Sequence, residues 1–93
     1  MNDRIVRLLR IEGRVQGVGY RDWMVHVVAG TLDGWVRNRR DGSVEALVAG
    51  GAEAVARVIA ACRRGPPAAR VTQVTEAAAE DPGPVGFSRR PTA

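Results

Sequence analysis

The residues best suited to chemistry lie near the start of the chain, in a glycine-rich run followed by an arginine. Gly13, Gly17 and Gly19 fall within the stretch GRVQGVG, and Arg21 follows in the first turn of a predicted helix. Backbone N–H groups in such a turn can converge on one anion, and a helix N-terminus adds further N–H groups and a favourable dipole. A planar guanidinium can bind two phosphoryl oxygens at once. These residue types predict a site for a phosphate or another oxyanion.

The glycine-rich run is a weak signal when taken alone. A cation in the first helical turn is unfavourable for the dipole unless an anion lies between them, which favours the anion site. The run lacks the Lys-Ser/Thr pair of a Walker loop and the acidic ribose ligand of a dinucleotide-binding unit. A plain turn followed by a surface arginine explains the same residues, and the two interpretations are about equal at this point.

A second candidate is Asn38, which ends a predicted strand just before the turn signal Asp41-Gly42. Its amide can accept a hydrogen bond from a water molecule and donate another, so it could orient a nucleophile. Taken without the first motif, Asn38 is better explained as an ordinary turn residue. The neighbouring basic residues fit either a solvated hairpin or an attraction for anionic substrates; they are Arg37, Arg39 and Arg40.

Length and composition limit the classes of protein to consider. The chain has 93 residues, enough for one domain (1–93) with one small core. All 14 basic residues are arginine against 10 acidic ones, a net charge of +4 that fits a GC-rich genome better than a nucleic-acid partner. One cysteine, Cys62, and one histidine, His26, argue against an internal disulfide and against a metal site. No apolar run approaches the roughly 20 residues of a membrane span, and no signal peptide is evident, so we expect a cytoplasmic protein with no membrane partner.

Hydrophobic patterning predicts the elements that must position Arg21 and Asn38. A strand over 4–12 precedes the glycine-rich loop over 13–19 and a helix over 20–29. Strands over 34–38 and 43–49 form a hairpin, Gly50-Gly51 breaks the chain, and a helix over 52–64, a strand over 69–78 and a possible short strand over 87–90 follow. The second helix carries an apolar stripe of Val55, Val58, Ile59 and Cys62. The order predicts an α+β, ferredoxin-like βαββαβ sandwich, with two helices on one face of an antiparallel sheet.

Two stretches in this order resemble the signatures of the acylphosphatases. Ile11–Arg21, reading IEGRVQGVGYR, is similar to the first signature of that family, and GWVRN at Gly34–Asn38, followed by DGSV, is similar to the second. The stretch GPPAARV at Gly65–Val71 resembles the usual start of the family's fourth strand. The resemblance covers the chain from about Ile5 to Phe87, and it implies the same ferredoxin-like fold.

The resemblance implies hydrolysis of acyl phosphates to a carboxylate and inorganic phosphate, without a metal or a cofactor. Arg21 would bind the phosphoryl group and Asn38 would orient the attacking water. The phosphate-binding loop would comprise Gly13, Arg14, Val15, Gln16, Gly17, Val18 and Gly19. The partners would be a small acyl phosphate as substrate and inorganic phosphate as product and inhibitor. Because a carboxylate leaves as a stable anion, no general acid is required, and alkyl phosphate esters should be poor substrates.

Two positions depart from the family pattern. Thr31 stands where a glycine usually caps the first helix, so we expect that helix to end sooner or differently, with some local loss of stability. Arg89 stands where an aliphatic residue is usual, which puts the fifth strand in question. Residues 91–93 are expected to be loose.

Two other functions fit a ferredoxin-like domain. One is a non-catalytic module that binds phosphate or RNA, but aromatic residues make up only 4% of the chain, and the strands over 4–12 and 43–49 contain none on which bases could stack. We therefore expect no nucleic-acid partner. The other is a domain of a larger carbamoyl-transfer maturation enzyme, but the chain has no zinc-finger cysteines after this unit. A monomeric, independent enzyme is the favoured prediction.

Overall fold

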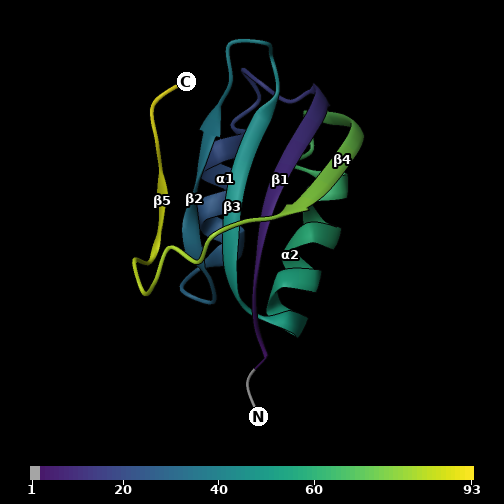
Figure 1. Cartoon of the computed structure of the whole chain (residues 1–93). Coiled ribbons are helices and arrows are strands. Elements are labelled where there is room, and N and C mark those ends of the chain that lie inside the picture. Colours follow the sequence, from purple (N-terminus) through teal and green to yellow (C-terminus); the bar gives the residue numbers. More distant parts are fainter. Residues whose placement is uncertain (1–2) are drawn as a thin grey trace.

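A computed structural model describes residues 3–93 as five strands and two helices (Figure 1). In chain order these are β1 (Arg4–Arg14), α1 (Tyr20–Val28), β2 (Asp33–Asn38), β3 (Val44–Gly51), α2 (Ala52–Arg64), β4 (Arg70–Ala78) and β5 (Phe87–Arg89). All five strands form one sheet in the order β4-β1-β3-β2-β5. The predicted βαββαβ order and ferredoxin-like arrangement are confirmed.

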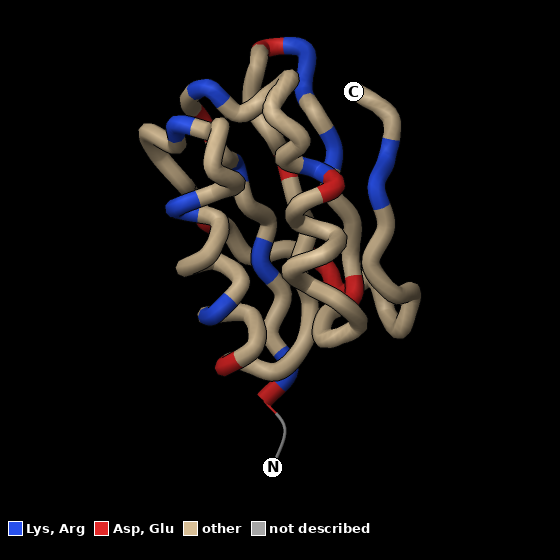
Figure 2. Tube along the Cα trace, turned by 180° about the vertical axis from the view of Figure 1, so that it is seen from behind, with Lys and Arg blue, Asp and Glu red and all other residues tan. Residues whose placement is uncertain are grey.

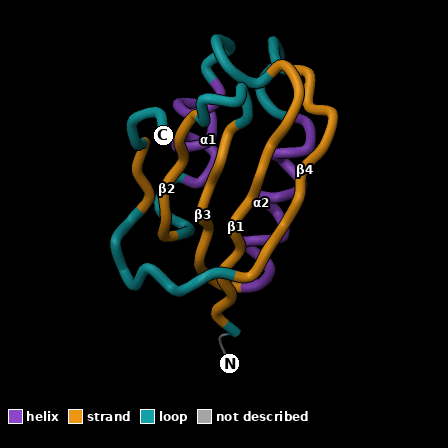
Figure 3. Tube along the Cα trace, turned by 45° about the horizontal axis from the view of Figure 1, so that its top comes forward, coloured by secondary structure: helices purple, strands orange, loops and turns teal. Residues whose placement is uncertain are grey.

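Both helices cover the same face of the sheet, as predicted, and among the described residues no helix covers the other face (Figure 3). The strand pairs β1–β3, β1–β4 and β2–β3 are antiparallel. The short β5 instead runs parallel to β2, from Gly34 opposite Phe87 to Val36 opposite Arg89. The prediction of an antiparallel sheet is therefore right for the four long strands and wrong for the fifth, because β5 joins the edge after a long connection from β4.

The core lies between the helices and the sheet, where the predicted apolar faces meet. Leu9 and Ile11 of β1 are fully buried, as the alternation in that strand predicted. The predicted stripe of α2 is also buried: Val55, Val58, Ile59 and Cys62. In α1 the buried residues are Tyr20, Met24 and Val28, whereas Val27, which was predicted on the same stripe, is only half-buried.

The strands β1 and β3 extend further than predicted, because the glycines that were expected to end them are part of the strands. β1 continues through Gly13 and Arg14, which pair with Val71 and Arg70 after a shift in register at Glu12. β3 continues through Gly50 and Gly51, which pair with the start of β1. At Gly50 an added Cβ would lie 2.6 Å from a methyl carbon of Leu32, so the glycine permits close packing rather than breaking the strand.

The end of α1 shows how the chain accommodates Thr31. The helix ends at Val28, one residue earlier than predicted, and Ala29 (φ 39°) and Gly30 (φ 80°) adopt left-handed backbone conformations. The Thr31 hydroxyl then donates to the carbonyl oxygen of Val28 over 2.6 Å. Ala29 is the single non-glycine residue with a positive φ among the residues described, so some backbone strain is stored at this helix end.

The last strand forms despite Arg89. Beyond it the Arg90 N–H donates to the carbonyl oxygen of Val36, and the Ala93 N–H donates to that of Asn38. The segment over 91–93, which was predicted to be loose, thus ends in a backbone hydrogen bond beside the end of β2. Backbone pairing at a sheet edge does not depend on the identity of the side chain, which explains why an arginine is tolerated there.

A buried hydrogen bond from Tyr20, the first residue of α1, joins this helix to α2. The Tyr20 hydroxyl donates to the carbonyl oxygen of Cys62 over 2.7 Å. The N–H that would bond this carbonyl in a longer helix is missing, because the residue at that position is Pro66. Burial raises the pKa of Tyr20 well above its ordinary value, and burial raises the pKa of the Cys62 thiol to about 11. The phenol therefore stays protonated in the folded protein.

Replacing Tyr20 by phenylalanine is expected to lower the free energy of unfolding by about 1–2 kcal/mol at pH 7, since a buried carbonyl loses its donor. The phenol ionises near 10.0 when unfolded and only at higher pH when folded. Its contribution is therefore present below pH 10 and is lost as the pH rises further. Urea unfolding of wild type and variant should show the largest difference at neutral pH, and a difference that widens above pH 10 would contradict this assignment.

The close pairing of β2 and β3 depends on Gly34, which has a φ of 132°. A Cβ at Gly34 would lie 1.8 Å from the carbonyl oxygen of Leu47 on β3, so Gly34→Ala must push the two strands apart. We expect a loss of about 2–4 kcal/mol in the free energy of unfolding. Gly51→Ala is the matched control, because Gly51 has a φ of −61° and open space around its Cβ position. Equal melting temperatures for the two variants would contradict the prediction.

Candidate active site

The loop between β1 and α1 is anchored by its apolar side chains. Val15 is 1% exposed and belongs to the core, and Val18 packs against that core. Between and after them, Gly17 (φ 72°) and Gly19 (φ 76°) adopt left-handed backbone conformations. No atom lies within 4 Å of a Cβ added at either glycine, so the backbone angle and not a lack of space favours glycine there.

This loop forms one wall of a cavity of about 120 Å³ that brings together distant parts of the chain. Residues of the loop, the first turn of α1, the end of β2 and β5 line it: Val15, Gly17, Gly19, Tyr20, Arg21, Asp22, Asn38 and Arg89. Arg21 and Asn38, predicted from separate motifs, therefore share one cavity. A larger depression of about 300 Å³ lies between α2 and the sheet, away from both residues.

Part of the predicted loop does not line the cavity. Gly13 and Arg14 belong to β1, and a Cβ on Gly13 would lie 2.1 Å from the carbonyl oxygen of Arg70, so this glycine serves strand packing. The loop proper thus begins at Val15, later than predicted. Gln16 and Val18 are also absent from the cavity wall, since Gln16 reaches the turn between β2 and β3 and Val18 faces the core.

Arg21 and Asn38 are half-buried, and within residues 3–93 no side-chain hydrogen bond or ion pair engages either of them. The N-terminus of α1 has no side-chain cap, because Gly19 occupies that position. The N–H groups of the first helical turn thus have no side chain to satisfy them, and they lie beside the cavity. Such N–H groups, a guanidinium and an amide form a suitable environment for an oxyanion.

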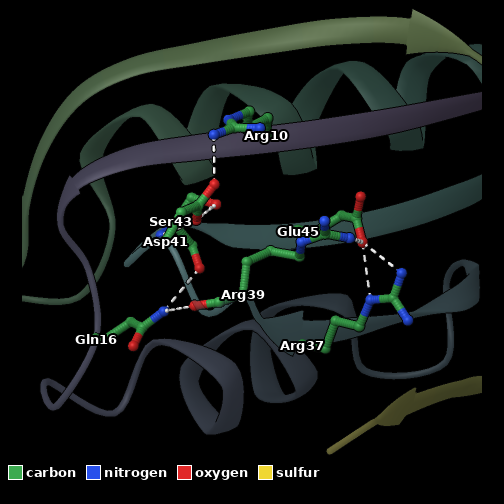
Figure 4. Close-up of polar contacts among 7 residues, drawn as sticks. All are labelled: Arg10, Gln16, Arg37, Arg39, Asp41, Ser43 and Glu45. Carbon is green, nitrogen blue, oxygen red and sulfur yellow. Dashed lines mark hydrogen bonds and ion pairs between the residues drawn. The ribbon is translucent and has the colours of Figure 1, made fainter. Parts of the chain in front are cut away.

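The other arginines near the hairpin are engaged elsewhere. Arg37 and Arg39 both pair with Glu45, over 2.7 Å and 3.3 Å, as Figure 4 shows. The Arg37 guanidinium also lies 4.5 Å from the centre of the Trp35 ring. Figure 2 shows basic and acidic segments next to one another at the turn between β2 and β3. These contacts favour the interpretation of Arg37 and Arg39 as hairpin surface residues over a role in attracting substrate.

Three residues of the cavity wall were not predicted as site residues: Tyr20, Asp22 and Arg89. Arg89 enters from β5, and its Nη1 donates to Oδ1 of Asp22 in the first turn of α1. The sequence carried one signal for this position: Arg89 follows Phe87 by two, so both side chains lie on the same face of the strand. That face is the one covered by the helices, because Phe87 packs against the core.

Among residues 3–93, no three His, Cys, Asp or Glu side chains come together as ligands for a metal ion. Over the same residues, neither helix is long and apolar enough to cross a membrane.

The matching family model and the curated relatives name one family. The sequence model of the acylphosphatases matches residues 8–89. An acylphosphatase of Acidiphilium cryptum is 56% identical over 89 residues, which cover 95% of this chain and 98% of the relative. The crystal structure of acylphosphatase from Bacillus subtilis superposes with a TM-score of 0.87 at 33% identity and covers 92% of this chain and 98% of that one. An acylphosphatase structure from Coxiella burnetii gives 0.88 at 27% identity, covering 96% and 94%. With the fold, both motifs and this similarity in agreement, the chain belongs to the acylphosphatase family, the hydrolases that act on acyl phosphates.

Proposed function

We propose that the cavity between the loop, α1 and β2 is where acyl phosphates are hydrolysed. The backbone N–H groups of the loop and the Arg21 guanidinium hold the phosphoryl group, and the Asn38 amide orients the attacking water. The observation that supports these roles is that Arg21 and Asn38 line one cavity and have no competing side-chain partner within residues 3–93. Membership of the family favours this enzymatic function over the non-catalytic alternative.

The reaction requires little covalent chemistry from the protein. The water oxygen attacks phosphorus in line, the bond between phosphorus and the acyl oxygen breaks, and the carboxylate leaves with the electron pair. The proton lost by the water remains with inorganic phosphate or passes to solvent. Since the transition state is loose and the leaving group is a weak base, positioning and charge stabilisation provide most of the catalysis. Arg21, the loop N–H groups and Asn38 can supply both.

Several finer expectations from the sequence stay predictions. These are a cytoplasmic location, a monomeric state, the absence of a nucleic-acid partner, and hydrolysis that requires no metal or cofactor. Competitive inhibition by inorganic phosphate also belongs here, because the product retains the group that Arg21 is proposed to bind.

Substitution of Arg21 or Asn38 is expected to abolish activity without unfolding the protein. Hydrolysis of benzoyl phosphate, followed with excess chelator, should fall by about 10³-fold or more in Arg21→Ala. Arg21→Lys should also be severely impaired, since a point charge cannot replace a bidentate fork. Asn38→Ala should lose turnover while retaining affinity for inorganic phosphate.

The matched control is Arg40→Ala, which removes the same charge from the exposed end of the hairpin. It should keep wild-type turnover, and all variants should keep the wild-type melting temperature. Retained turnover in Arg21→Ala would sink the mechanism.

Gln16 connects the two halves of the cavity, although it does not line the cavity itself. Its Nε2 donates to the carbonyl oxygens of Arg39, over 2.7 Å, and Ser43, over 2.9 Å (Figure 4). The hydroxyl and N–H of Ser43 in turn donate to Asp41, and they hold the pKa of Asp41 below its ordinary value. Because Arg39 directly follows Asn38, the Gln16 amide sets the distance between the phosphate-binding loop and Asn38. Gln16 is thus a positioning residue.

Loss of the Gln16 amide should therefore reduce kcat more than it weakens phosphate binding. In Gln16→Met the loop keeps its own N–H groups and Arg21, but Asn38 is no longer held against it, so kcat should fall by about tenfold or more. The inhibition constant for inorganic phosphate should change little. Gln73→Met, an exposed change on β4, serves as the control. A lower melting temperature with unchanged kcat would show that Gln16 has a structural role only.

A further inference from the structure

Arg89 places a second guanidinium at the cavity that holds Arg21 and Asn38. Its strand, β5, pairs with β2 so that Arg89 lies opposite Val36, and the side chain is on the face that the helices cover. Arg89 is nevertheless exposed, and its side chain extends along the cavity wall toward α1, where it pairs with Asp22. Arg90, the next residue, lies on the other face, with its guanidinium 5.1 Å from the Trp35 ring.

The partner of Arg89 in this structure is a carboxylate, that of Asp22. The side chains are 45% and 72% exposed, respectively, and ion pairs with such exposure contribute little to stability. Exchanging Asp22 for another carboxylate at Arg89 is therefore a low-cost event. The structure thus shows a guanidinium at the edge of the cavity paired with a carboxylate, in an exposed contact that another carboxylate could replace at little cost.

The size of the cavity decides which part of a substrate would reach Arg89. Its volume of about 120 Å³ is small beside the roughly 300–1,000 Å³ of pockets that enclose drug-sized ligands. A phosphoryl group with its attacking water suits that space, and the acyl part must extend toward solvent. Arg89 and Asp22 are both exposed, so their pair lies where the cavity opens.

We propose that Arg89 is a specificity-determining residue, which binds a carboxylate on the acyl part of the substrate in place of Asp22. The preferred substrates are then acyl phosphates of dicarboxylic acids, in which one carboxyl is phosphorylated and the other remains ionised. This inference rests on the proposed function, since it takes the phosphoryl group to be held by Arg21 and the loop. Asp22 competes with the substrate carboxylate for Arg89, so it lowers the affinity of the protein for such substrates. When Arg89 is replaced, the Asp22 carboxylate repels the carboxylate of the substrate.

Two phosphonates that cannot be hydrolysed provide the first test, because their binding needs no activity. 3-Phosphonopropionate carries a carboxylate on its carbon chain, and propylphosphonate of similar length does not. Calorimetry on wild-type protein should show tighter binding of 3-phosphonopropionate, and Arg89→Gln should reduce that preference by about tenfold, the value of one charge-assisted hydrogen bond. Propylphosphonate should bind both proteins alike.

Asp22→Asn and Arg90→Gln complete the binding experiment. Asp22→Asn releases Arg89, so it should increase the preference for 3-phosphonopropionate, and Asp22→Asn combined with Arg89→Gln should lose it. Arg90→Gln removes an equal charge from the same end of the chain on the opposite face, and it should leave the preference unchanged. If Arg89→Gln weakens both phosphonates equally, or changes neither, the assignment of Arg89 to a substrate carboxylate is overturned.

Measurements of turnover distinguish a failure of this inference from a failure of the proposed function. Wild-type protein should hydrolyse both benzoyl phosphate and succinyl phosphate, and Arg89→Gln should lower kcat/KM for succinyl phosphate alone. Hydrolysis of both substrates with the same ratio in wild type and Arg89→Gln would overturn the role of Arg89 and leave the proposed function intact. If the wild type hydrolyses neither substrate, the proposed function is overturned. The preference between the two phosphonates would still decide whether Arg89 binds a carboxylate.

Discussion

One side-chain amide, that of Gln16, joins the glycine-rich loop to the hairpin between β2 and β3. The catalytic groups proposed here lie on opposite sides of that contact, with Arg21 on the helix that follows the loop and Asn38 on the strand that enters the hairpin. Other features stiffen each side of it: the buried Val15 holds the loop to the core, and Asp41 holds the hairpin turn. Since positioning provides much of the catalysis of phosphoryl transfer, rigidity at this contact is what the proposed mechanism requires.

The local hydrophobic pattern correctly predicted the strands and helices whose apolar side chains pack against the core. The alternation of Leu9 and Ile11 predicted the buried face of β1, and the stripe from Val55 to Cys62 predicted α2. The pattern was wrong where a distant segment overrides a local preference. Gly50 looks like a break in the sequence, but β1 lies beside it and completes the ladder. Arg21 and Asn38 were singled out by the resemblance of two motifs to the family signatures, because the residues alone left Asn38 as an ordinary turn residue. Local spacing could not predict Arg89, since no local rule says which element the fifth strand will join.

The arginine composition of the chain carries less information than the placement of each arginine. Within residues 3–93, six of the 14 arginines pair with carboxylates, and Glu45 alone engages both Arg37 and Arg39. Arg21 differs from these six because no carboxylate within residues 3–93 pairs with it, and it lines the same cavity as Asn38. A single guanidinium without a partner, beside backbone N–H groups in a cavity, is a stronger indication of anion binding than the net charge of the whole chain.

The central place of β1 in the sheet has a consequence for how the chain folds. β1 pairs with β3 on one side and with β4 on the other, and β4 spans Arg70–Ala78, near the opposite end of the sequence. Closing so long a loop is entropically costly, so we expect this non-local pairing to slow the folding of the domain. During synthesis β1 emerges well before β4, and until β4 pairs with it one side of β1 presents unpaired N–H and C=O groups. In this interval the nascent chain is most exposed to aggregation through that edge.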